Sequence, residues 1–187
     1  MEGKCIIFSA PSGAGKTTIV KFLLKQEFGL RFSVSAATRP QRDHEMNGRD
    51  YHFMSEEKFK ELVETGAFVE WEEVYPGHFY GTLKSEIQQI WKDGFHPIFD
   101  VDVVGGLDLK AAFGKNALSI FVSPPSMEIL ETRLRDRATE SKENIELRLQ
   151  KAAHEKGYSD LFDVLLMNDD LDRACKEACS LVKSFLK

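Results

Sequence analysis

Long hydrophobic runs are absent from this 187-residue sequence, and no segment approaches the roughly 18 apolar residues that a membrane-spanning helix needs. The apolar run near Ile6 is too short for a signal peptide, because a glycine-rich turn follows it almost at once. We therefore expect neither a membrane span nor a secretory leader. The hydrophobic fraction of 42% and the charged fraction of 29% are ordinary for a soluble globular protein.

Cysteine is scarce, and so is excess positive charge. The three cysteines form no C-x-x-C pair, which favours free thiols in a reducing cytoplasm over disulfides or a metal site. The formal net charge of −5 argues against a general binder of nucleic acid or anionic membranes, whose affinity depends on clustered lysine and arginine. The five histidines show no metal-ligand spacing. Small anionic ligands are not excluded, because a local group of arginines could still bind them.

What the sequence does contain is an alternation of short apolar strands and longer helices. Residues 5–8 are apolar and partly β-branched or aromatic, which predicts a buried strand, and residues 16–26 carry apolar side chains on one helical face. This order predicts an α/β fold in one domain over residues 1–187. The further helices are expected at residues 83–91, 105–113, 126–137 and 171–186, and the further strands at residues 32–39, 96–103, 117–122 and 162–167.

Two segments depart from this alternation. A helix at residues 55–64 is followed by a strand at residues 68–74 with alternating apolar and acidic side chains, then by the turn Pro76-Gly77 and a short return strand at residues 78–80. We expect a small antiparallel lobe here, inserted after the second core strand. Residues 137–158 are strongly charged with few apolar side chains, which predicts a solvent-exposed, mobile helical lid.

The turn after the first strand, "SAPSGAGKTT", fits the phosphate-binding pattern G-x-x-x-x-G-K-[ST] except that Ala10 takes the place of the first glycine. Gly13 and Gly15 allow the backbone N–H groups to approach phosphate oxygens closely. Lys16 can reach the β- and γ-phosphates of a nucleotide, and Thr17 can bind Mg²⁺. The alternative, an ordinary turn, leaves the lysine directed at a helix N-terminus without a reason.

Further motifs follow in a fixed order: "SVSAATRPQRDHEMNGRDYHF", "FVEWEEVYPGHFYGT", "FDVDVVG" and "NDDL". Together with the phosphate loop they resemble guanylate kinases over nearly the whole chain. The resemblance implies a P-loop NTPase-type three-layer fold with a five-stranded parallel core sheet, which the strands near residues 5, 32, 98, 120 and 165 would supply. It also implies a core of about residues 1–33, 84–124 and 158–187, a GMP-binding lobe of about residues 34–83 and a lid of about residues 125–157. Alanine at position 10 is common in bacterial-looking members.

The resemblance implies two groups of site residues. The ATP-binding residues are Ala10, Pro11, Ser12, Gly13, Ala14, Gly15, Lys16, Thr17, Thr18, Arg133 and Asn168, with Thr17 as the Mg²⁺ ligand. The GMP-binding residues are Ser35, Arg39, Arg42, Tyr51, Glu70, Tyr80, Thr82 and Asp102.

The chemistry of the second group suits GMP. Guanidinium groups such as Arg39 and phenols such as Tyr51 can donate several hydrogen bonds to a phosphate dianion, although a solvated arginine loop is the simpler reading of the arginines alone. The Glu70 carboxylate can accept from both N1–H and the N2 amine of guanine, whereas adenine would leave it unpaired. We interpret Glu72 and Glu73 as a solvated face of the strand.

Phosphoryl transfer to GMP needs no general base, because the attacking phosphate oxygen of GMP is already ionised. The expected catalytic residues are Lys16, Arg39, Asp100, Arg137 and Arg148, the last two as lid arginines.

Two of the assignments have structural alternatives. Asp100 would lie near Mg²⁺ or would cap the backbone at Gly105. Asn168 would lie near the adenine or would cap a loop.

The expected function is transfer of the γ-phosphate of ATP to GMP and dGMP in the cytoplasm, for guanine nucleotide synthesis and recycling, with Mg²⁺ and without nucleic acid or membrane partners. One rival is a non-catalytic guanylate-kinase-like module that binds a peptide; the retained loop from Gly13 to Thr17 argues against it. Another is a kinase for a different nucleoside monophosphate, against which Glu70 and the arginine–tyrosine segment argue.

Overall fold

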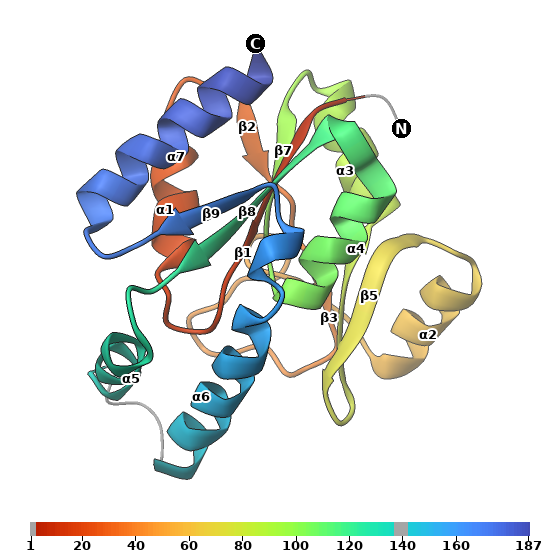
Figure 1. Ribbon diagram of the computed structural model, residues 1–187. Coiled ribbons are helices and arrows are strands. Elements are labelled where there is room, and N and C mark those ends of the chain that lie inside the picture. Colours follow the sequence, from red (N-terminus) through yellow and green to blue (C-terminus); the bar gives the residue numbers. More distant parts are fainter. Residues whose placement is uncertain (1–2, 137–141) are drawn as a thin grey trace.

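The computed structural model describes residues 3–136 and 142–187, and within them a five-stranded parallel sheet forms the centre of the molecule (Figure 1). The strand order is β2-β7-β1-β8-β9, and every neighbouring pair is parallel. The predicted α/β fold with a five-stranded parallel core sheet is confirmed. The strands are β1 Cys5–Ser9, β2 Leu30–Phe32, β7 His96–Val101, β8 Ala117–Ser123 and β9 Val164–Met167.

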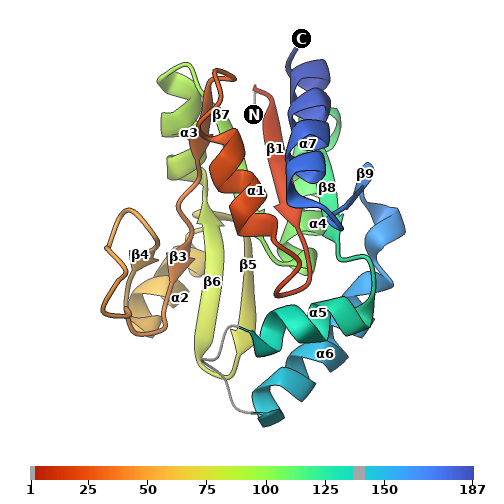
Figure 2. The same ribbon diagram turned by 90° about the vertical axis from the view of Figure 1, so that its left-hand side faces the viewer.

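Helices cover both faces of this sheet (Figures 1 and 2). Alternate residues of β1 explain the three layers, because Ile6 and Phe8 join one apolar cluster while Cys5 and Ile7 join the other. All four side chains are fully buried, as expected for a central parallel strand. The first cluster packs against α1 (Lys16–Leu23) and α7 (Leu171–Leu186), and the second lies on the side of α3 (Lys84–Lys92) and α4 (Val103–Phe113).

A second, smaller sheet forms the predicted lobe, with strand order β4-β3-β6-β5. The pairings β5–β6 and β3–β6 are antiparallel, but β3–β4 is parallel, so the lobe is mixed rather than purely antiparallel. The stacked rings of Phe59 and Phe68 lie at its centre. Its elements are β3 Ala36–Ala37, β4 His52–Phe53, α2 Glu56–Glu64, β5 Phe68–Tyr75 and β6 His78–Leu83.

The single strand predicted at residues 32–39 is wrong. β2 ends at Phe32, and the Ser33 N–H still donates to the Ile98 carbonyl oxygen at 3.0 Å before the chain leaves the core sheet. Two residues of the same stretch, Ala36 and Ala37, then pair with the lobe strands β4 and β6. One apolar segment therefore serves two sheets, which periodicity alone does not reveal.

Two helices form the third part of the molecule, α5 (Met127–Arg135) and α6 (Lys142–Lys156). They pack on each other through Leu130, Leu134, Ile145 and Ala152. Figure 2 shows this pair and the lobe on opposite sides below the core sheet. Short 3₁₀ turns at Gly114–Asn116 and Ser159–Leu161 complete the described chain. In that part of the chain, no helix has the length and apolar character to cross a membrane.

The parallel strands determine where a site can form. The turn after β1 and the ends of β7 and β8 lie at the same edge of the sheet, because parallel strands end on one side. In open α/β sheets, ligands bind beyond these carboxyl ends. Here that edge faces the lobe on one side and the α5–α6 pair on the other (Figure 2).

Candidate functional site

The phosphate loop takes a conformation that two glycines make accessible. Gly13 and Gly15 have φ of 92° and 94°, a left-handed region in which other residues are strained. Gly15 is the N-cap of α1, so the residues that follow point their free N–H groups into the loop, at the positive end of the helix dipole. The loop is thus shaped to receive an anion.

Ala10 is compatible with this shape. It is 6% exposed and belongs to the apolar cluster beneath α1, so its methyl group packs inward. The two left-handed positions of the loop lie after it. The methyl group at the first motif position therefore does not obstruct the anion-binding amides.

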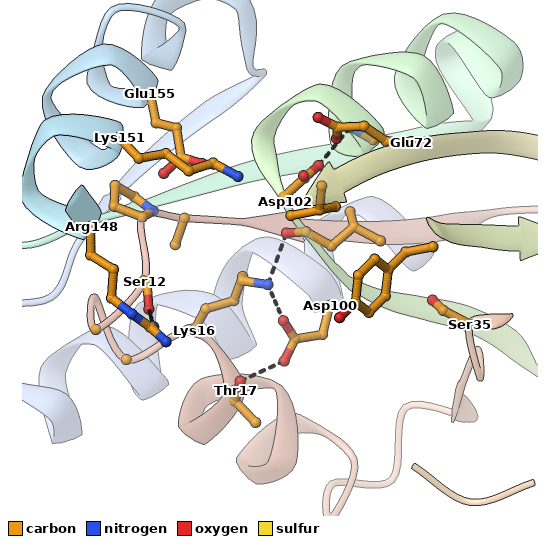
Figure 3. Close-up of a pocket in the computed structure, with 18 of the residues that line it drawn as sticks. Ser12, Lys16, Thr17, Ser35, Glu72, Asp100, Asp102, Arg148, Lys151 and Glu155 are labelled. Atoms are coloured by element: carbon orange, nitrogen blue, oxygen red, sulfur yellow. Dashed lines mark hydrogen bonds and ion pairs between the residues drawn. The ribbon is translucent and has the colours of Figure 1, made fainter. Parts of the chain in front are cut away.

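Lys16 and Thr17 converge on one acidic residue at the end of β7. The Lys16 ammonium bonds to the Asp100 carboxylate and donates to the Val101 carbonyl oxygen at 2.8 Å, and the Thr17 hydroxyl donates to Asp100 Oδ2 at 2.7 Å (Figure 3). Asp100 therefore lies at the phosphate loop. The cap of Gly105, considered for Asp100, belongs to Asp102, whose Oδ1 accepts from the Gly105 N–H at 2.9 Å.

Asn168 supports the loop from behind. It is 3% exposed, and its Nδ2 donates to the Ala14 carbonyl oxygen at 2.7 Å. A Cβ placed on Gly15 would lie only 2.2 Å from that nitrogen, so the loop and the asparagine fit each other closely. The bond to Ala14 agrees with the loop-cap alternative for Asn168, whereas the cap of α7 belongs to Asp170. Asn168 Oδ1 and Arg133 Nη1 are both buried without a hydrogen-bond partner among the described residues.

Helix α6 contributes side chains from the opposite wall. Arg148 Nη1 donates to the Ser12 hydroxyl of the loop, and Lys151 and Glu155 also line the cavity (Figure 3). Burial raises the pKa of Glu155 to about 7 despite the nearby Lys151. The other predicted lid arginine, Arg137, lies outside the described residues.

The lobe supplies a buried carboxyl. Glu70 on β5 is 9% exposed and accepts a hydrogen bond from Thr82, its cross-strand partner on β6. Burial raises the pKa of Glu70 to about 7, and the Thr82 hydroxyl offsets part of that shift. Glu70 Oε2 would lie 3.0 Å from a Cβ on Gly105, so the glycine lets α4 approach this carboxyl.

The expectation that Glu72 lies on a solvated face of the strand is wrong. Glu72 is half-buried, lines the cavity, and its carboxyl lies against that of Asp102 (Figure 3). Burial, together with the contact to Asp102, raises the pKa of Glu72 to about 8. The expectation holds for Glu73, which is exposed on the other face of the strand.

The arginines predicted for the acceptor phosphate differ from each other. Arg39 is half-buried, and its guanidinium lies 4.9 Å from the ring centre of Tyr51. The Tyr51 and Tyr80 rings are 5.9 Å apart, and both tyrosines line the cavity. Burial raises the pKa of Tyr51, so this phenol stays a donor at neutral pH. Arg42 is exposed and does not line the cavity.

These walls enclose one cavity of about 370 Å³. It joins the phosphate loop to the lobe carboxyls, which the sequence separates by more than fifty residues. The predicted site residues that line it are Ala10, Pro11, Ser12, Gly13, Gly15, Lys16, Thr17, Thr18, Ser35, Tyr51, Glu70, Tyr80, Asp100, Asp102 and Arg148. Those that do not are Ala14, Arg39, Arg42, Thr82, Arg133 and Asn168.

Three further charged residues line the cavity and were not predicted, namely Glu72, Lys151 and Glu155, and a fourth, Glu45, contacts the predicted Arg39 without lining the cavity. Glu72 had a usable signal, because strand periodicity puts it on the same face as Glu70. The two α6 residues also follow a pattern, since 148, 151 and 155 are spaced as neighbours on one helical face. No such signal marks Glu45, which lies in an irregular charged loop.

A parallel sheet, a phosphate loop between β1 and α1, and a second set of phenols and carboxyls across the same cavity define a P-loop protein. Comparison with known proteins identifies the family. The guanylate kinase family model matches residues 2–185. The chain belongs to the guanylate kinase family, the nucleoside monophosphate kinases whose known reaction is ATP:GMP phosphotransfer.

Individual relatives agree over the full length. A guanylate kinase from Bacteroides thetaiotaomicron is 47% identical over 186 residues, covering 100% of this chain and 91% of the relative. One from Porphyromonas gingivalis is 47% identical over 184 residues, 98% of each chain. The crystal structure of guanylate kinase from Anaplasma phagocytophilum matches with a TM-score of 0.78 at 27% identity, covering 97% of this chain and 85% of that one.

Proposed function

We propose that the cavity binds ATP and GMP together and aligns the γ-phosphate of ATP with the phosphate of GMP. The observation that carries this proposal is the opposition of two kinds of anion-binding group, the loop at Lys16 and the donors at Tyr51 and Tyr80, across one cavity. Holding the two phosphates in line replaces a bimolecular encounter by a positioned one. The nucleophile is already ionised, so the protein contributes position and charge rather than a base.

On the donor side, the loop amides and Lys16 bind the β- and γ-phosphates. Arg148 reaches the loop from α6 and adds positive charge on the far side of the transferring group, with Arg137 proposed for the same role. The buried donor of Arg133 and the buried acceptor of Asn168 are both without partners among the described residues. We assign Arg133 to the ATP phosphates and Asn168 to the neighbourhood of the adenine.

The residues at the loop fit a magnesium ion. Thr17 and Asp100 present a hydroxyl and a carboxylate oxygen 2.7 Å apart, and Mg²⁺ prefers a few such oxygens together with substrate phosphates and water. Among the described residues no group of three or more His, Cys, Asp or Glu side chains is placed to hold a metal by itself. Mg²⁺ bound there with ATP would neutralise charge on the phosphates as they react.

On the acceptor side, Glu70 accepts from N1–H and the N2 amine of guanine, with Asp102 beside it and Ser35 and Thr82 as hydroxyl contacts. Arg39, Arg42, Tyr51 and Tyr80 bind the phosphate. Arg42 is exposed in the structure, and its assignment rests on the family resemblance. Because the recognised groups are on the base and the phosphate, we include dGMP as a substrate.

We assign these tasks to three parts of one domain: a core of about residues 1–33, 84–124 and 158–187, a GMP-binding lobe of about 34–83 and a lid of about 125–157. A cytoplasmic location, where ATP and GMP are available, suits this function. Neither a nucleic acid nor a membrane is part of the proposal.

A coupled assay tests it. GMP, AMP, CMP and UMP are each offered with ATP and Mg²⁺, and ADP formation is followed. We expect turnover with GMP to exceed turnover with AMP by at least about 10³-fold in kcat/KM, because AMP leaves the buried carboxyl unpaired. Equal turnover of AMP, or no turnover of any acceptor, contradicts the proposal. The second outcome would favour a peptide-binding module.

A further inference from the structure

Glu45 is a buried carboxylate to which the proposed function gives no task. It lies in the irregular loop between β3 and β4, is 8% exposed, and does not line the cavity. Burying a carboxylate is costly unless it is paired and hydrogen-bonded. The partners of Glu45 therefore indicate its role.

Its main partner is the guanidinium of Arg39. Arg39 Nη1 donates to Glu45 Oε2 at 2.7 Å, and Nη2 donates to Oε1 at 2.6 Å, which is a paired, fork-like contact. The Arg42 backbone N–H donates to Glu45 Oε2 at 2.9 Å. One carboxylate thus joins the side chain of the first loop arginine to the backbone of the second. The hydrogen bonds from Arg39 lower the pKa of Glu45 to about 2, so it is ionised at every working pH.

Glu45 and Pro40 do not use the whole guanidinium of Arg39, which also interacts with the phenols of Tyr51 and Tyr80, its expected partners at the acceptor phosphate. Nη1 uses its second hydrogen on the Pro40 carbonyl oxygen at 2.9 Å. The Nε–H and the second hydrogen of Nη2 lie on the other edge of the guanidinium, and they bond neither to Glu45 nor to Pro40. The face of the group lies against the rings of Tyr51 and Phe53, at 4.9 and 5.4 Å from their centres. Carboxylate and rings together fix its plane and its rotation.

We propose that Glu45 is a positioning residue, which holds Arg39 so that its Nε–Nη2 edge is presented to the phosphate of the acceptor nucleotide. This proposal rests on the proposed function, in which Arg39 binds that phosphate. An arginine fixed before the ligand arrives loses less side-chain entropy on binding. Glu45 never touches the substrate, and its effect passes through Arg39.

Simple electrostatics makes the opposite prediction. Glu45 is a negative charge close to the place where a phosphate dianion must bind, so its removal should strengthen phosphate binding. Positioning predicts that its removal weakens binding, because Arg39 then samples other rotamers. The two accounts differ in the sign of the effect.

The experiment compares Glu45→Gln with Glu64→Gln, which removes the same charge from an exposed position on α2 of the same lobe. With Glu45→Gln we expect KM for GMP to rise by about three- to tenfold, the range for one freed side chain. KM for ATP should change by less than twofold, and Glu64→Gln should resemble the wild type. A KM for GMP that falls or stays the same in Glu45→Gln overturns the proposal.

Two further measurements distinguish the loss of Arg39 positioning from unfolding of the lobe. Binding of guanosine, which has no phosphate, should be unchanged in Glu45→Gln, whereas equal losses of guanosine and GMP affinity would show a collapsed lobe and overturn the proposal. Glu45→Asp keeps the charge but shortens the reach, so it should weaken GMP binding as well; wild-type behaviour would show that only the charge matters.

In an Arg39→Lys background, replacing Glu45 should have little additional effect on GMP binding, since the group that it positions is gone. A full additional loss there overturns the proposal. Failure of the proposed function is distinguishable, because in that case the wild-type chain would not bind GMP more tightly than guanosine.

Discussion

In the proposed function, the two ends of the cavity bind phosphate by different means. At the donor end, backbone N–H groups of a glycine loop and one helix terminus form the site, and a buried asparagine supports it at 2.7 Å. At the acceptor end, long side chains from a polar loop and two strands form it, held by ion pairs such as Arg39–Glu45. Main-chain sites are fixed by the fold itself. Side-chain sites need additional residues to hold them, and those residues can also tune specificity.

The largest effect is expected at the donor end. Lys16→Ala removes the only side-chain cation that the loop sequence itself contributes, and kcat should fall by about 10²–10³-fold or more. Its counter-charge, Asp100, keeps the Thr17 hydroxyl as a partner, so the fold should persist. Steady-state kinetics and thermal melting measure the two effects, with Lys21→Ala, exposed on the same helix, as the control. An unchanged kcat would show that the loop is not the donor site.

At the acceptor end, Glu70→Gln should change specificity more than stability. The amide offers one acceptor where the carboxylate offers two, so kcat/KM for GMP should fall by about 10²-fold while the weak activity with AMP changes little. Glu73→Gln, exposed on the other face of β5, is the matched control. Discrimination equal to the wild type would mean that the base binds elsewhere.

The same carboxyl gives a pH dependence. Burial raises the pKa of Glu70 from its ordinary value of 4.5 to about 7, whereas accepting hydrogen bonds from guanine requires the ionised form. KM for GMP should therefore fall as pH rises from 6 to 8, by several-fold, while KM for ATP stays nearly constant. In Glu70→Gln the pH dependence of KM for GMP should be flatter. A wild-type KM for GMP that rises over this range contradicts the assignment.

The next prediction tests whether Asn168 restrains the donor loop. Gly15→Ala places a methyl group on a residue with φ of 94° and 2.2 Å from Asn168 Nδ2, so both strain and overlap should destabilise the fold, by about 1–3 kcal/mol. Gly29→Ala is the control, since φ there is 65° and nothing lies within 4 Å of the added Cβ. Denaturant unfolding gives both values. Equal losses in the two variants would show that Asn168 does not restrain the loop.

The contrast between the ends also explains what could be predicted from the sequence. The donor loop is contiguous, so Gly13 to Thr17 and the flanking strand and helix were legible as one motif. Four of the five parallel strands could be predicted from their short apolar runs, whereas the strand predicted at residues 32–39 extended past the end of β2 at Phe32. The expected acceptor end is assembled from residues 35 to 102, and its members were identified through the family resemblance rather than from local pattern.

The errors have physical causes. Glu72 looks like a surface residue in a strand of alternating charge, and only the packing of α4 against β5 buries it beside Asp102. The segment after residue 32 looks like one strand, because apolar periodicity does not record that the chain changes sheets at Ser33. Glu45 depends on the path of an irregular loop, which turns back so that a residue six positions away meets Arg39.

The smallest expected effect is on the melting temperature, and it comes from the half-buried Glu72 carboxyl at the acceptor end. The pKa of Glu72 is raised to about 8, so the folded state favours its protonated form. Its stabilising contribution is present at low pH and is lost as pH rises from about 4.5 through 8. Glu72→Gln should therefore leave the melting temperature nearly unchanged at pH 5 and raise it at pH 9 by about 2–4 °C, which corresponds to about 1 kcal/mol after allowing for solvent screening. Glu73→Gln should show no such dependence on pH. A lower melting temperature of Glu72→Gln at pH 9 would mean that the ionised carboxylate is stabilised by a cation such as Lys151, and the acceptor end would then be as well compensated as the donor end.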